Sequence, residues 1–231
     1  MSQSTNDRII ISQLNPKSPV SEAYRMLRTN IQYSSVDTDL QVLMITSAGP
    51  GEGKTTTVGN LAVTYAQADQ KVLVIDADLR KPTMHRIFRQ SNRTGLSTVL
   101  TNQSDVNHEI KSTDIPNLHI LTSGPIPPNP SELLNSNRMR TLLEELKQSY
   151  TRIIIDTPPT LVITDAQIVS TLCQGVILVI DSEKVKKDAA IKAKASLDKV
   201  NANIIGVVLN NVSQKNNDSY YYYYYYGKEE Q

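Results

Sequence analysis

Several residue types are scarce in this sequence, and each shortage narrows what the protein can be. The 231 residues include one cysteine, one phenylalanine and no tryptophan. The single cysteine, Cys173, excludes an internal disulfide framework and fits a reducing compartment, so we expect a cytoplasmic protein. No apolar run approaches the roughly 18 residues of a membrane-spanning helix, and residues 1–15 lack the pattern of an export signal. We therefore expect neither a membrane span nor export.

A large charge of one sign is also missing. The chain has 24 Lys and Arg residues against 23 Asp and Glu residues, which gives a formal net charge of +1. Nucleic acids and anionic membranes attract proteins largely through an excess of positive charge. The composition gives no general electrostatic reason for either to be the main ligand, and we predict no nucleic-acid partner.

What the chain does have is a series of aliphatic runs of strand length that alternate with segments of helix length. Because most of these runs are continuously apolar, the strands should be buried on both faces, as in a parallel sheet covered by helices. This pattern predicts a doubly wound, mostly parallel α/β fold. The expected strands are residues 42–45, 72–75, 119–121, 153–155, 176–180 and 204–209, and the expected helices are residues 18–33, 54–68, 131–150 (capped by Ser131), 165–173 and 184–201.

The last residues break this pattern. A single-residue repeat between polar flanks is typical of a low-complexity tail. We therefore divide the chain into an N-terminal extension (residues 1–17), one domain (18–212) and a tyrosine-rich tail (213–231). The repeat in the tail consists of seven consecutive tyrosines, Tyr220, Tyr221, Tyr222, Tyr223, Tyr224, Tyr225 and Tyr226.

A phosphate-binding loop follows the first expected strand. Residues 48–55 read Ala-Gly-Pro-Gly-Glu-Gly-Lys-Thr, which fits the P-loop pattern except that Ala48 replaces the first glycine. Glycines let successive N–H groups turn inward around a phosphate, the lysine reaches the outer phosphates, and the next hydroxyl ligates Mg²⁺. A chance glycine turn is set aside because strand, loop and helix come in the required order, and we expect Lys54 to face solvent and the nucleotide. The expected nucleotide-binding residues are Gly49, Pro50, Gly51, Glu52, Gly53, Lys54, Thr55 and Thr56.

Acidic residues follow two further strands. Asp76 and Asp78 lie at the end of the second strand and, two positions apart on an extended segment, project to the same side. Asp156 follows a later apolar strand, in the form of a Walker B aspartate. Ligands of open α/β sheets bind at the carboxyl ends of the strands, so these acids should face the nucleotide. Helix capping or turn formation is the alternative for each of them.

Together these motifs resemble those of the bacterial tyrosine kinases, which share the fold of the MinD and ParA ATPases. The resemblance covers nearly the whole chain, including the tyrosine cluster. Among these kinases the chain is similar to the Gram-positive CpsD and CapB type, the separate cytoplasmic subunits of capsule and exopolysaccharide systems. MinD and ParA carry an extra lysine five positions before the P-loop lysine, where this chain has Gly49. Their nucleotide-sandwich dimer therefore loses its defining contact here.

The resemblance implies an ATP- and Mg²⁺-dependent protein-tyrosine kinase that phosphorylates its own tail in trans. Asp76 is then the base that accepts the tyrosine proton, while Thr55, Asp78 and Asp156 serve the metal region. The residues alone do not separate the roles of the three carboxylates. Asn210 follows the last strand, where related ATPases use an asparagine to read adenine, and a turn residue is the alternative.

The resemblance also implies partners. Glu22, Arg25 and Arg28 match the family's ExxRxxR oligomerisation motif, although the same spacing fits a solvated helix face. The family's activator is a membrane-spanning protein of the polysaccharide co-polymerase type, which would recruit this chain to the inner face of the cell membrane. A homo-oligomer in the form of a ring, protein tyrosine substrates and a phosphotyrosine phosphatase complete the expected set.

The predicted function is control of capsular or exopolysaccharide synthesis and export through tyrosine phosphorylation. The rival is a MinD- or ParA-like ATPase switch without kinase activity, and a third possibility is an inactive enzyme whose tail is only a docking segment. The tail and Gly49 argue against the ATPase. The intact Lys54, Asp76, Asp78 and Asp156 argue against the inactive enzyme.

Overall fold

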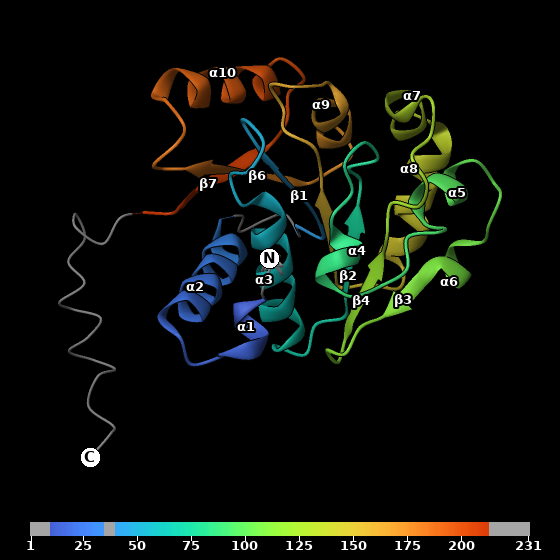
Figure 1. Cartoon of the computed structure of the whole chain (residues 1–231), viewed down its shortest axis with the longest axis horizontal. Coiled ribbons are helices and arrows are strands. Elements are labelled where there is room, and N and C mark those ends of the chain that lie inside the picture. The colour runs from blue at the N-terminus through green and yellow to red at the C-terminus, as the bar shows by residue number, and fades with distance from the viewer. Residues whose placement is uncertain (1–9, 35–39, 213–231) are drawn as a thin grey trace, which may run out of the picture.

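The computed structural model describes residues 10–34 and 40–212. Its strands form one sheet in the order β3-β4-β2-β5-β1-β6-β7 (Figure 1). Every neighbouring pair is parallel except β3 and β4, which confirms the predicted mostly parallel α/β fold. The strands are β1 (Val42–Ser47), β2 (Val72–Asp76), β3 (Ile110–Ser112), β4 (Leu118–Leu121), β5 (Arg152–Asp156), β6 (Gly175–Asp181) and β7 (Ile204–Asn210).

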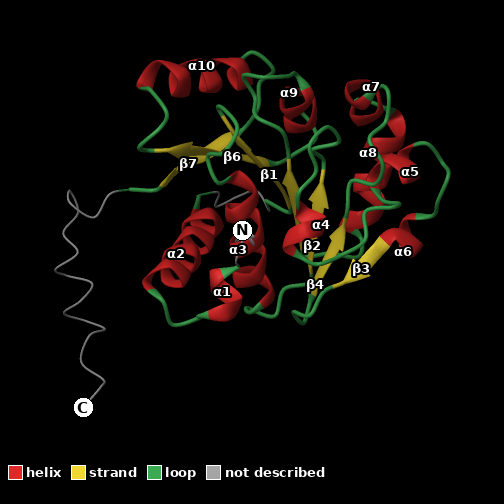
Figure 2. Cartoon of the chain, viewed as in Figure 1, coloured by secondary structure: helices red, strands yellow, loops and turns green. Residues whose placement is uncertain are grey.

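Helices cover both faces of this sheet, as Figure 2 shows. One face carries α1 (Ile11–Leu14), α2 (Pro19–Tyr33), α3 (Lys54–Ala66) and α4 (Met84–Ile87). The other carries α5 (Leu96–Leu100), α6 (Val106–Glu109), α7 (Pro130–Leu134), α8 (Asn137–Lys147), α9 (Asp165–Ser170) and α10 (Lys187–Asp198). Within the described ranges, no helix is both long enough and apolar enough to cross a membrane.

Two apolar clusters fill the space between the sheet and the helices. Successive side chains of a strand point to opposite faces. In β1, Val42 and Met44 therefore join the cluster under α5–α10, whereas Leu43 and Ile45 join the cluster under α1–α4. All four side chains are fully buried. A strand with two buried faces must be apolar at every position, which is why the continuous aliphatic runs located the strands.

Two expectations about local structure are wrong. The single helix expected over residues 131–150 is two helices, because the chain turns at Asn135 and Ser136 caps α8 by accepting a hydrogen bond from the N–H of Met139 at 3.2 Å. Ser131 caps neither helix, since it is the second residue of α7. The antiparallel edge strand β3 was not expected, because its three residues are too few to carry a pattern.

The described end of the N-terminal segment packs onto the domain. Ile10 is buried in the cluster under α1–α4. The Ser12 N–H donates to Asn60 Oδ1 at 2.9 Å, and Gln67 Nε2 donates to the Ser12 carbonyl at 3.0 Å, which fastens α1 to α3. Ile10 and Ser12, assigned above to an extension, therefore pack against the domain, and the division of the chain into three parts stays a prediction. The expected tyrosine tail lies outside the described residues.

The two-sided core predicts a strong contrast between two leucines. Leu73, in β2, is fully buried, whereas Leu209, on the outer strand β7, is 62% exposed. We expect Leu73→Ala to lower the free energy of unfolding by about 2–5 kcal/mol, because it leaves a cavity in a packed core. Leu209→Ala should change it by less than about 0.5 kcal/mol. Urea denaturation of both variants measures the difference, and equal losses would contradict the described burial.

Candidate functional site

The candidate site lies at the carboxyl edge of the sheet, where β1, β2 and β5 end side by side. The strands β2 and β5 pair in register, so that Asp76 lies directly opposite Asp156. The P-loop leaves β1 at the same edge and leads into α3. Parallel pairing thus brings together three motifs that are far apart in the sequence, as the alternation of strands and helices predicted.

The P-loop has the backbone geometry that its glycines predicted. Gly51 and Gly53 have φ values of 78° and 90°, which is the left-handed region that favours glycine. A Cβ at Gly53 would lie 2.1 Å from Nδ2 of Asn210, so a larger residue would also collide there. Asn210 Nδ2 in turn donates to the Glu52 carbonyl at 3.0 Å, and the Gly49 N–H donates to the Glu52 carboxylate. Asn210 therefore supports the loop, and its contact with adenine stays a prediction.

Lys54 lies inside the site and does not face solvent as expected. Its side chain is only 11% exposed, and Nζ lies 3.2 Å from Asp156 Oδ1 and 3.6 Å from Asp78 Oδ2. Nζ also donates to the Thr55 hydroxyl at 3.2 Å. The reason is electrostatic, because the nearest opposite charges belong to the acids at the ends of β2 and β5. The sequence predicted all four residues, but not that the lysine contacts the acids.

Asp76 accepts more hydrogen bonds from backbone N–H groups than Asp78 or Asp156 does. Its Oδ2 accepts from the N–H groups of Thr83 and Met84 at 3.1 and 3.0 Å, and its Oδ1 accepts from the Asp78 N–H at 3.2 Å. Burial, and then the nearby Asp156 carboxylate, raise the pKa of Asp76 to about 7. A pKa near neutrality suits a group that must take up a proton. The same hydrogen bonds also shape the loop between β2 and α4.

One carboxylate oxygen of Asp156 lacks a partner among the residues that the structure describes. Its Oδ1 accepts from Lys54, but within the same residues Oδ2 has no hydrogen-bond partner, although the side chain is completely buried. Burial raises the pKa of this carboxyl above its ordinary value. Most buried polar atoms have a hydrogen-bond partner, and a bound ion is one common reason for an exception. Oδ2, beside Lys54, is therefore an acceptor that a cation from outside the chain could use.

The oxygens around Lys54 fit a magnesium ion. Carboxylates and hydroxyls are hard oxygen ligands, and Asp78, Asp156 and Thr55 offer them within reach of one ammonium group. Across the described ranges, no three His, Cys, Asp or Glu side chains are grouped to form a metal cage. Mg²⁺ normally takes one or two protein carboxylates and fills its remaining positions with water and phosphate oxygens. This donor set matches that habit.

The expected oligomerisation residues make contacts within the chain. Glu22 and Arg25 form an ion pair with each other, and Arg25 also donates to the Pro16 carbonyl. Arg28 Nη1 donates to the Thr64 carbonyl at 2.5 Å, which links α2 to α3. All three side chains belong to α2 and have partners within the same chain. Their part in an interface between copies stays a prediction.

One cluster beside the site was missed from the sequence. Arg80 forms an ion pair with Asp165, at the start of α9, with Nε 2.8 Å from Oδ2. The two residues are 85 positions apart, so no local pattern links them. The only signal in the sequence was the arginine itself, two positions after Asp78.

The crowded acids predict a pH-dependent stability in the absence of nucleotide and Mg²⁺. Because the pKa of Asp156 is raised in the folded state, its stabilising contribution is present below the ordinary value of 3.8 and is lost as the pH rises through the folded-state pKa. We expect Asp156→Asn, which keeps an acceptor for Lys54, to raise the thermal midpoint at pH 8 more than at pH 5. Each kcal/mol gained appears as roughly 2–4 °C.

The control for this experiment is Asp114→Asn, which changes an exposed acid outside the site. Its thermal midpoint should follow that of the unmodified protein at both pH values. If Asp156→Asn were less stable than the unmodified protein at pH 8, the ion pair with Lys54 would outweigh the excess of negative charge.

Comparisons with known proteins show which proteins the chain is similar to. Residues 40–206 match a family described as an AAA domain. The tyrosine-protein kinase YwqD of Bacillus subtilis is 48% identical over 203 residues, which cover 88% of this chain and 86% of YwqD. The solved chimerical protein CapA2B2 is 46% identical, with a TM-score of 0.86, over 89% of this chain and 90% of its own. The septum site-determining protein MinD from Pyrococcus horikoshii, solved with Mg-ADP, is 24% identical, with a TM-score of 0.63, over 76% of this chain and 72% of its own.

These similarities differ in what they show. At 24% identity, the likeness to MinD shows only that the two chains share the P-loop nucleotide-binding fold. The likeness to YwqD is much closer, and it extends over most of both chains. This confirms the resemblance found in the sequence and identifies the protein as an enzyme. The chain belongs to the family of bacterial protein-tyrosine kinases.

Proposed function

We propose that this kinase transfers the γ-phosphoryl group of ATP to tyrosines, and that its first substrates are the tail residues Tyr220–Tyr226 of a neighbouring copy. The observation that carries the proposal is the position of Lys54, at the end of the P-loop and between the carboxylates of Asp78 and Asp156. Phosphoryl transfer depends mainly on positioning and on neutralising charge, and this cluster offers groups for both.

The proposed roles follow from the chemistry of each group. Backbone N–H groups of Gly49 and of residues 51–56 would surround the phosphates, and the Lys54 ammonium would bind the β- and γ-phosphates. Thr55, Asp78 and Asp156 would hold Mg²⁺, which when bound neutralises charge on the phosphate oxygens. Asp76 would accept the tyrosine proton, a role supported by its pKa of about 7.

The contacts of Lys54 suggest how nucleotide and metal enter together. In the absence of nucleotide, the ammonium lies against the same carboxylates that would bind Mg²⁺. Arriving phosphates give Lys54 an alternative partner, and its departure frees the carboxylates for the metal. Each ligand therefore favours the other, because each removes a charge that would otherwise be left unpaired in a buried site. We expect ATP and Mg²⁺ to bind as a unit.

We further propose that the enzyme works as a homo-oligomeric ring. Glu22, Arg25 and Arg28 would contribute to the interface, and their partly exposed positions on α2 are compatible with that role. A membrane-spanning activator would recruit the chain to the inner face of the cell membrane, and phosphorylation would regulate capsular or exopolysaccharide synthesis and export. A phosphotyrosine phosphatase would reset the cycle. The chimerical nature of CapA2B2 supports a complex with a second component.

Transfer in trans is tested by mixing two incomplete proteins. The first carries Lys54→Met and a complete tail; the second has an intact site but ends after Ser219. With Mg-ATP present, we expect the Lys54→Met protein to become phosphorylated only in the mixture. The second protein then supplies the lysine that binds phosphate, and the first supplies the tail that receives it. Intact mass and peptide mapping locate the phosphate, and each reaction is repeated with the cytoplasmic end of the membrane partner.

Each other outcome contradicts a separate part of the proposal. Phosphate on the Lys54→Met protein alone would show that the assigned site is wrong. No phosphate on it in the mixture, while the unmodified protein labels itself, would exclude transfer between copies. ATP hydrolysis by the unmodified protein without any phosphotyrosine would favour the rival, a MinD- or ParA-like ATPase switch.

A further inference from the structure

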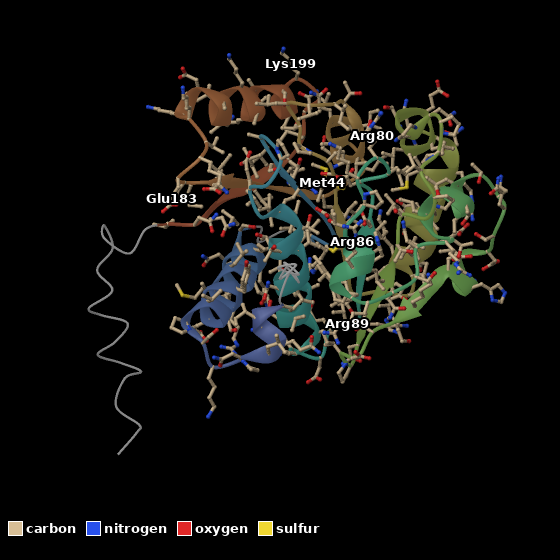
Figure 3. The ribbon with its side chains drawn as sticks, in the orientation of Figure 1. Met44, Arg80, Arg86, Arg89, Glu183 and Lys199 are labelled. Atoms are coloured by element: carbon tan, nitrogen blue, oxygen red, sulfur yellow. The ribbon has the colours of Figure 1, made fainter. Side chains whose placement is uncertain are left out.

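Arg80 makes a two-point ion pair beside the carboxylate cluster. Its Nε lies 2.8 Å from Asp165 Oδ2, and its Nη2 lies 3.2 Å from Asp165 Oδ1. The Ser131 hydroxyl donates to Asp165 Oδ1 at 2.6 Å and accepts from Arg80 Nη2 at 3.0 Å. The loop after β2, the start of α7 and the start of α9 therefore meet at one point, where Figure 3 labels Arg80.

The geometry of this contact requires an arginine. Asp165 is completely buried, and a buried carboxylate needs a partner that satisfies both its charge and its oxygens. The planar guanidinium offers two parallel donors that match the two carboxylate oxygens, which a lysine ammonium does not. The Arg80 side chain remains 38% exposed, so the guanidinium lies on the solvent side of the buried Asp165 carboxylate.

The same loop carries Asp78, one of the carboxylates that face Lys54. Asp78 Oδ1 accepts from the Lys81 N–H at 2.9 Å, while its Oδ2 lies 3.6 Å from Lys54 Nζ. Arg80 lies between Asp78 and Lys81 in the sequence. A displacement of Arg80 therefore moves the N–H group that orients the Asp78 carboxylate.

Two kinds of contact hold this loop, and they do different work. Leu79 is buried in the apolar cluster under α5–α10, whereas Met84, at the far end of the loop, is buried in the cluster under α1–α4. The loop thus crosses the edge of the sheet with an apolar anchor on each face. Apolar packing is not directional, but an ion pair with three hydrogen bonds is. Arg80 can therefore set the orientation of a loop that Leu79 and Met84 keep in place.

We propose that Arg80, held by Asp165 and Ser131, is a positioning residue for the metal site: it fixes the loop so that the Asp78 carboxylate is oriented to bind Mg²⁺ together with the nucleotide. This inference rests on the proposed function only in placing Mg²⁺ at Asp78. Groups that orient a metal ligand commonly change metal affinity without touching the metal. The ion pair would act on phosphoryl transfer through Asp78 and would not touch the substrate.

The experiment compares the Mg²⁺ requirement of the full-length protein and its Arg80→Met variant. Methionine keeps a long apolar side chain but removes every donor. Binding of a fluorescent ADP analogue is measured over a range of Mg²⁺ concentrations. We expect the variant to need on the order of 10-fold more Mg²⁺ for half-maximal binding, with the same affinity once Mg²⁺ is saturating. The matched control is Arg138→Met, which breaks the ion pair with Glu145 on α8 and should leave the Mg²⁺ requirement unchanged.

A second variant separates positioning from stability. Arg80→Met leaves the buried Asp165 carboxylate without its cation and should lower the thermal midpoint. Adding Asp165→Asn removes the buried charge, so the double variant should regain much of that midpoint while its Mg²⁺ requirement stays raised. If the Mg²⁺ requirement were unchanged in Arg80→Met, or returned to normal together with the midpoint, the ion pair would be a structural contact only.

The readout also distinguishes this inference from the proposed function. Nucleotide binding does not require phosphoryl transfer. An unmodified protein that binds the ADP analogue with Mg²⁺ but phosphorylates no tyrosine would overturn the proposed function and leave the role of Arg80 testable by the same titration. Binding of the ADP analogue that does not depend on Mg²⁺ at all would overturn the role of Arg80, while the proposed phosphoryl transfer is decided by the mixing experiment.

Discussion

Three carboxylates, Asp76, Asp78 and Asp156, share one ammonium group at the carboxyl edge of the sheet, and the rest of the site is arranged around this imbalance. Water cannot compensate for the excess negative charge, because Asp76 and Asp156 are completely buried. Backbone N–H groups donate to Asp76, and the pKa values of Asp76 and Asp156 are both raised, but in the described part of the chain one oxygen of Asp156 has no hydrogen-bond partner. The cluster is therefore suited to bind cations, and its excess of negative charge lowers the stability of the nucleotide-free domain.

The fold produces this crowding by simple means. Parallel strands bring their carboxyl ends to one edge, and the pairing of β2 with β5 places Asp76 directly opposite Asp156. The P-loop enters from β1 and delivers Lys54 from the first turn of α3. The helices on both faces bury the strands and so exclude water from beneath the acids. Rigid packing at the base of the site thus supports charged groups that would not stay together in solution.

The parts that could be predicted from the sequence are those with local patterns. Continuous aliphatic runs located most strands, and the glycine spacing and acidic strand ends located Lys54, Asp76 and Asp156. Contacts between distant segments could not be predicted this way. The ion pair of Arg80 with Asp165 joins residues 85 positions apart, and the position of Lys54 among the acids depends on how the strands pair. The break between α7 and α8 was missed because serine, although favoured at the start of a helix, is also tolerated inside one, so Ser136 alone does not show that a new helix begins.

The proton balance of ligand binding tests this account most directly. Calorimetric titration of the nucleotide-free protein with Mg-ADP, in buffers of different ionisation enthalpy, measures how many protons are released. With a pKa of about 7, Asp76 is partly protonated at pH 7. A cation bound beside it should displace that proton. We predict net proton release at pH 7 that becomes smaller at pH 9, where Asp76 is already ionised. Proton uptake at pH 7, or no net change in bound protons, would contradict the account of a cluster of buried acids that binds a cation.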